Sequence, residues 1–169
     1  MVDYVIDGSN ALLGLLIKRV PSVRALARVL ASLDEKKLTF TVWFDNSIRS
    51  HMGQYASELP AFDALMQVLR DANLVNMAPR ADKGIQKACK QFDCPVINSS
   101  DNNDSWAFQP TIFRCRFTAD KSSIFIARAY SRTRLLQVSV NEGFEFRGLR
   151  FPPIAGLGDI ESPVVSIPR

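Results

Sequence analysis

The chain has little of what several large enzyme classes require. Its 169 residues include one histidine, His51, and three cysteines, Cys89, Cys94 and Cys115, which form no close-paired motif. A single histidine without a nearby cysteine pair argues against a zinc site and against a Ser/His/Asp triad. Three unpaired cysteines, with no apolar leader and cleavage site, favour a reducing, cytoplasmic location.

Long apolar runs are also missing. The main early apolar segment, residues 11–17, is far shorter than the roughly 20 residues that a membrane span needs. We therefore expect no membrane association. A chain of this length suits one domain and is long enough to bury most of its apolar surface without disulfides.

Basic charge is concentrated toward the C-terminus. Residues 1–111 contain 12 Lys and Arg and 12 Asp and Glu, whereas residues 112–150 contain 8 basic and 3 acidic residues, in a chain of net charge +4. A basic surface attached to a domain with an acidic cluster favours a polyanionic partner such as RNA, because Lys and Arg supply much of nucleic-acid affinity through phosphate contacts. The alternative is ordinary surface charge for solubility.

Periodicity predicts an α/β fold. Helical spacing over 22–37, 61–72 and 82–92 alternates with strand-like runs at 3–6, 39–44, 74–77 and 95–98. This alternation predicts a mostly parallel sheet covered by helices on both faces. From about residue 112 the pattern changes to strands at 112–117, 123–130, 135–140 and 144–147, which predict an antiparallel extension. We expect one domain over 1–111, with a basic β-meander and an irregular Pro/Gly-rich tail over 112–169 packed on it.

Acidic residues follow several predicted strands. Asp7 follows an apolar strand directly, Asp45 follows the run at 39–44, and Asp101 and Asp104 follow the run at 95–98, while Asp82 opens a helix. A carboxylate next to a buried strand costs several kcal/mol unless a cation or donors compensate it. Ligands of open α/β sheets collect at the carboxyl ends of strands, so these acids predict an oxygen-rich Mg²⁺ or Mn²⁺ site. Each acid alone is more often a helix cap or a turn residue.

Three segments resemble one family in the expected order. Residues 5–10 (VIDGSN) resemble the opening motif of NYN domains of the PIN-like nuclease superfamily, closest to the regnase-type CCCH zinc-finger ribonucleases. Residues 81–88 (ADKGIQKA) are similar to the DDRFIVKL segment of that family, and residues 96–104 (VINSSDNND) are similar to its VVSNDxxxD segment. The resemblance covers about residues 3–110 and implies a three-layer α/β/α PIN-like domain.

The resemblance implies a metal-dependent ribonuclease. Its acidic site would comprise Asp7, Asp82, Asp101 and Asp104, with Mg²⁺ or Mn²⁺ activating water for phosphodiester hydrolysis, and Asn10 would orient a carboxylate, water or phosphate. The chain departs from the family at two places, because Ala81 replaces an Asp and the last two aspartates are spaced differently. Which of these two is the principal ligand stays open, and the zinc finger is absent.

Several side chains are candidates for substrate contact. Near the acidic segments these are Ser9, Arg49, Arg80, Lys83, Lys87 and Trp106, and in the meander they are Arg114 and Arg116, which alternate with apolar residues and share one strand face. Arginine and lysine would bind phosphates, and Trp106 would stack on an unpaired base. The alternatives are an ion pair for Arg49, a solvated Lys87 and a core position for Trp106.

Two rival functions remain from the sequence. A haloacid-dehalogenase-type phosphatase also has an Asp after its first strand, but it needs a second Asp where this chain has Ser9. A catalytically inactive PIN-like module would bind RNA or a protein, and Ala81 would then mark a decayed site. A protein partner or a homodimer is possible in either case, and no nucleotide cofactor is expected.

Overall fold

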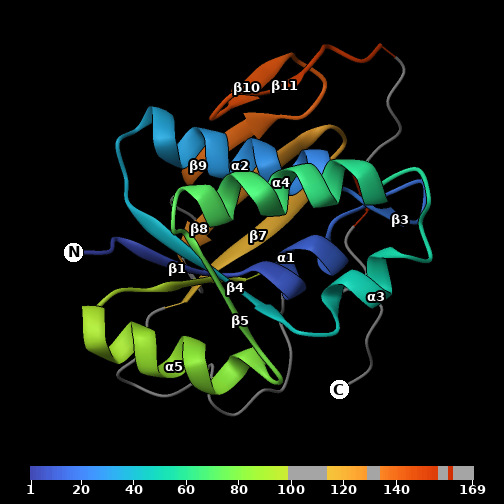
Figure 1. The fold of residues 1–169 in the computed structure, drawn as a ribbon. Coiled ribbons are helices and arrows are strands. Elements are labelled where there is room, and N and C mark those ends of the chain that lie inside the picture. The colour runs from blue at the N-terminus through green and yellow to red at the C-terminus, as the bar shows by residue number, and fades with distance from the viewer. Residues whose placement is uncertain (99–113, 129–133, 156–159, 162–169) are drawn as a thin grey trace, which may run out of the picture.

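The computed structural model describes residues 1–98, 114–128, 134–155 and 160–161, which form an α/β structure around one main sheet (Figure 1). This sheet has seven strands in the order β5-β4-β1-β6-β7-β8-β9. In chain order they are β1 (Tyr4–Asp7), β4 (Phe40–Asp45), β5 (Val75–Ala78), β6 (Val96–Asn98), β7 (Arg114–Asp120), β8 (Ser123–Arg128) and β9 (Arg134–Ser139). Neighbours from β5 to β7 pair in parallel, and β8 and β9 continue the sheet in antiparallel fashion. The predicted α/β class with a central parallel sheet is therefore confirmed.

Helices cover both faces of the parallel strands (Figure 1). They are α1 (Gly8–Gly14), α2 (Val23–Glu35) and α4 (Leu59–Asp71) on one face, α5 (Ala81–Phe92) on the other, and the short α3 (Ile48–Met52) after β4. Because side chains alternate along a strand, Ile6 and Val42 belong to the large core cluster, while Val5 and Val96 pack with α5. Within the described ranges, no helix has both the length and the apolar composition of a membrane span.

The direction of the chain across the sheet reverses beside β1. The chain passes from β1 to β4 and then to β5, and α5 carries it back across the other face to β6, which pairs with the free side of β1. Ligands of open α/β sheets bind outside the carboxyl ends of the strands at such a reversal. Asp7 is the last residue of β1 and therefore lies at this point.

Short elements that periodicity did not predict complete the fold. A hairpin of β2 (Leu16–Ile17) and β3 (Val20–Pro21) follows α1, and β12 (Ile160–Glu161) pairs with β2, so the tail that we expected to be irregular contains a strand. β10 (Phe144–Phe146) lies within the strand predicted at 144–147, and it forms a second hairpin with β11 (Leu149–Phe151), which was not predicted. Strands of two or three residues carry almost no periodic signal, and β12 depends on pairing with a segment more than 140 residues away in the chain.

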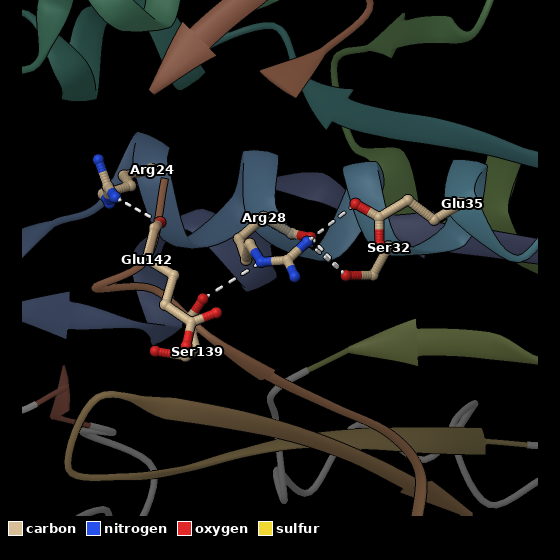
Figure 2. Close-up of polar contacts among 6 residues, drawn as sticks. All are labelled: Arg24, Arg28, Ser32, Glu35, Ser139 and Glu142. Atoms are coloured by element: carbon tan, nitrogen blue, oxygen red, sulfur yellow. Dashed lines mark hydrogen bonds and ion pairs between the residues drawn. The ribbon is translucent and has the colours of Figure 1, made fainter. Parts of the chain in front are cut away.

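The β10–β11 hairpin covers the outer side of α2, where Arg24 is buried, with 8% of its surface exposed (Figure 2). Its guanidinium donates from Nε to the carbonyl of Val140, from Nη1 to Pro152 at 2.7 Å and from Nη2 to Glu142 at 2.8 Å. Burial lowers the pKa of Arg24. The three carbonyls compensate the buried charge, and they tie the segment after β9 to α2.

A second arginine one helical turn along, Arg28, extends this attachment (Figure 2). Its Nε donates to the Ser139 carbonyl at 3.2 Å, and its Nη1 donates to Ser32 Oγ at 2.9 Å. At the hairpin tip, Arg147 forms a two-pronged ion pair with Asp34 at 2.8 and 2.9 Å. These contacts join residues near the two ends of the chain into the same packed unit.

Candidate functional site

Asp7 is held at the end of β1 by the helix that follows it. It is the N-cap residue of α1, and its Oδ1 accepts a hydrogen bond from the backbone N–H of Asn10 at 3.1 Å. Only 7% of its surface is exposed. The side chain is thus oriented by a local cap and lies at the carboxyl edge of the sheet, where the strand order reverses.

Ser9 links the exit of β1 to the exit of β4. Its buried Oγ accepts a hydrogen bond from the backbone N–H of Asp45 at 2.9 Å. This contact gives Ser9 a structural role, and its predicted substrate contact stays a prediction. Asn10, partly buried in the first turn of α1, contributes its backbone N–H to Asp7.

Asp45 continues this connection to α5. Its Oδ1 accepts a hydrogen bond from the backbone N–H of Ala81 at 2.8 Å. Arg80, the N-cap residue of α5, makes no side-chain cap hydrogen bond, so Asp45 satisfies one of the helix's first donors from across the sheet edge. The exits of β1 and β4 and the start of α5 are thereby fixed relative to one another.

Asp82 lies in the first turn of α5 and is exposed. It precedes Cys89 by two helical turns, so both lie on the same side of the helix. Cys89 hydrogen-bonds with the thiol of Cys94, which stands just before β6, and burial, followed by this neighbour, raises the pKa of Cys89 to about 12. Asp82 is therefore on the β6 side of α5. Ala81 occupies the position where the family that the chain resembles has a further acid. It packs in the apolar cluster with Val5.

Trp43 and Gly84 determine how closely α5 approaches the sheet. A Cβ built on Gly84 would lie 2.2 Å from Trp43 Cζ3 and 2.6 Å from Cη2, so only glycine fits against the indole ring. Trp43 stands in β4 opposite Asp7 in the parallel register. Its Nε1 is buried, and within the described part of the structure it has no hydrogen-bond partner.

The sequence interpretation missed Asn98. The register pairs Ile6 with Ile97, so the next residues of the two parallel strands, Asp7 and Asn98, end β1 and β6 side by side. Asn98 is only 1% exposed. A polar residue directly after the apolar pair Val96-Ile97 was the signal that could have indicated it.

Three predicted site residues, Asp101, Asp104 and Trp106, lie outside the described residues. Among the residues that are described, no three His, Cys, Asp or Glu side chains lie close enough to form a metal site. The described part of the chain thus contributes Asp7 and Asp82 to the predicted acidic set. Both provide carboxylate oxygens, the donors that Mg²⁺ and Mn²⁺ prefer.

The predicted phosphate-binding residues differ in their surroundings. Arg49 forms a two-pronged ion pair with Asp63 on α4, from Nε to Oδ1 at 3.0 Å and from Nη2 to Oδ2 at 2.9 Å. The hydrogen bond to Asp63 raises the pKa of Arg49. An ion pair of this kind is the alternative to phosphate binding that the sequence left open for Arg49. In β7, the backbones of Arg114 and Arg116 pair with β6, and their side chains lie outside what the structure describes.

Arg80 precedes α5 as its N-cap residue, Lys83 and Lys87 lie on α5, and all three are exposed. Arg80 and Lys83 flank Asp82 at the start of the helix, which Asp45 holds near the edge where β1 and β4 end, and Lys87 lies one turn beyond Lys83. Comparison with known proteins adds no assignment to this arrangement. No family model matches the chain, and no curated protein has a similar sequence.

Proposed function

We propose that the chain is a metal-dependent ribonuclease that hydrolyses phosphodiester bonds in single-stranded or looped RNA. The observation that best supports this is the position of Asp7, a residue that is 7% exposed at the carboxyl end of the central strand, where the strand order reverses. The α/β architecture with helices on both faces is compatible with the PIN-like fold that the resemblance of residues 5–10 to the NYN motif implies.

The chemistry of the donors suits a hard divalent cation. Asp7 and Asp82 offer only oxygen, and the only histidine, His51, lies exposed on α3. The resemblance adds Asp101 and Asp104 to the proposed ligands. A Mg²⁺ or Mn²⁺ ion held there would lower the pKa of a bound water and stabilise negative charge on the phosphate.

The residues of the chain would position this chemistry. The backbone N–H of Asn10 orients Asp7, and the hydrogen bonds through Ser9 and Asp45 hold the start of α5 next to the end of β1. Asp82 follows directly in that helix. Exposed basic side chains beside it would bind the phosphates of the substrate.

Replacement of the acids by amides tests the proposal. We expect Asp7→Asn and Asp82→Asn to reduce cleavage of a fluorescent single-stranded RNA in Mn²⁺ by about 100-fold or more, because each change removes a charged ligand. Asp7→Asn keeps an Oδ1 acceptor for the Asn10 N–H, so its fold should survive, and far-UV circular dichroism checks this. Asp71→Asn, at an exposed position at the end of α4, is the matched control. Undiminished cleavage by both site variants would refute the proposal.

A non-catalytic RNA-binding module is the second candidate. It is favoured by Ala81, which packs in the apolar cluster with Val5 at the position where the family that the chain resembles has a further acid. In that case the wild-type protein would bind single-stranded RNA and would cut it with neither Mg²⁺ nor Mn²⁺. Binding measured by titration with RNA, together with cleavage assays in Mg²⁺ and in Mn²⁺, separates the two functions.

A further inference from the structure

The outer face of α5 carries an uninterrupted line of cations. Four exposed basic residues follow one another at spacings of three and four, and we call them the basic row: Arg80, Lys83, Lys87 and Lys90. At 100° per residue the three lysines fall within about 60° of the helix circumference, and Arg80 directly precedes the helix as its N-cap residue. The side chains that α5 buries, Ala81, Ile85, Ala88 and Cys89, point the opposite way, into the sheet. The basic row therefore faces away from the core.

Helix stability favours this arrangement only at Lys90, which lies in the last turn of α5. Like charges three or four residues apart on a helix destabilise it, and cations near its N-terminus, such as Arg80 and Lys83, oppose the helix dipole. Among the described residues, none of the four forms an ion pair with a carboxylate. The one acidic side chain within the helix, Asp82, lies about 100° around from Lys83. A polyanion bound on this face would relieve the repulsion.

The basic row starts at the candidate site and leads away from it. Arg80 is the N-cap residue of the helix that Asp45 holds against the sheet edge, and Lys90 lies ten residues further, about 15 Å along the axis. A single line of cations complements one phosphate backbone, whereas duplex RNA is recognised mainly by shape across its minor groove. Among the residues of α5 itself no aromatic side chain is exposed, so the contact with the row would be electrostatic and independent of sequence.

We propose that the basic row of α5 is a track for the backbone of single-stranded RNA that leads to or from the acidic edge of the sheet. The identity of the substrate rests on the proposed ribonuclease function. Phosphates would bind successively along the row, and the two lysines at its far end, Lys87 and Lys90, would contribute to affinity even though they are distant from the reacting phosphate.

Salt dependence of binding tests the far end of the track. The probe is a fluorescein-labelled oligouridylate of about 12 nucleotides, followed by anisotropy in EDTA between about 50 and 200 mM salt, so that no cleavage occurs. Lys87→Gln/Lys90→Gln should reduce the slope of log K against log salt by about 1.4, since each lost phosphate contact is worth about 0.7. With an unchanged intercept at 1 M salt, this is about 25-fold weaker binding at 0.1 M.

The matched control is Lys36→Gln/Lys37→Gln, which removes the same charge from exposed lysines after α2. It should leave the slope nearly unchanged. Equal slopes for the two double variants would overturn the proposal, because net charge alone would then explain binding. Displacement of the RNA by polyglutamate of equal charge would also overturn it, in favour of an acidic protein partner.

Cleavage assays keep this proposal separate from the proposed function. If Asp7→Asn cuts RNA as well as wild type while the row variant binds weakly, the ribonuclease site is wrong and the track stands. If Asp7→Asn abolishes cutting while the row variant binds like wild type, the track is wrong and the site stands.

Discussion

Gly84→Ala isolates the contact that holds α5 against the sheet. In an ordinary helix interior, alanine in place of glycine stabilises a protein by about 0.5–1 kcal/mol. Here the added Cβ would lie 2.2 Å from Trp43 Cζ3, 2.6 Å from Cη2 and 2.8 Å from Cε3. The substitution should therefore act against its usual sign.

The magnitude follows from the size of this overlap. Carbon atoms in good contact are about 3.5–4.0 Å apart, so the helix or the ring must move by more than about 1 Å. Overpacking of this kind typically costs about 1–3 kcal/mol. After subtraction of the ordinary gain, we expect a net loss of about 1–2 kcal/mol in the free energy of unfolding. The shifted helix would also carry Asp82 away from Asp7 and lower RNA cleavage.

Urea unfolding followed by far-UV circular dichroism measures the effect. The control is the same change in a Trp43→Leu background, where the ring that causes the overlap is absent. There Gly84→Ala should raise stability by about 0.5–1 kcal/mol, which gives a coupling energy of about 2 kcal/mol between the two positions. A stabilising Gly84→Ala in the wild-type background would refute the close approach of α5 to Trp43.

Three further changes test the supports of the site and of the fold. Asp45→Ala removes the acceptor of the Ala81 N–H and should cost about 1 kcal/mol in urea unfolding, with a loss of cleavage; unchanged stability would contradict its capping role. Arg24→Met leaves three carbonyls without their buried donor and should lower the free energy of unfolding by about 3–5 kcal/mol, compared with about 1 kcal/mol for Arg28→Met. Equal losses of stability in the two variants would contradict the special role of the buried Arg24. Burial raises the pKa of Cys89 from 9.0 to about 12, so its contribution to native stability is present below pH 9 and is lost as the pH rises toward 12. In thermal melts, the melting temperature of Cys89→Ala should therefore fall less between pH 9 and about 10.5 than that of wild type. Equal falls in melting temperature would contradict the raised pKa of the Cys89 thiol.

Local patterns in the sequence were sufficient for the main elements. The apolar run at Val5-Ile6 predicted a buried strand, and the spacing of Leu26, Leu30 and Leu33 predicted the buried face of α2, since strand and helix periods depend only on nearby residues. A charged residue directly after the first strand indicated the sheet edge, and the structure places Asp7 where the strand order reverses.

Contacts between residues far apart in the chain decided what the sequence could not. The sequence placed Asp45 at a strand end, but its bond to Ala81, 36 residues away, depends on how β4 and α5 meet. Arg24 could be read as a solvated residue of an amphipathic helix, yet a hairpin more than 110 residues later buries it. Residue type and spacing therefore determined the main strands and helices and the candidate acid at the sheet edge. Tertiary packing fixed the partners of each polar group, because a hydrogen bond across the fold depends on distances that no local period encodes.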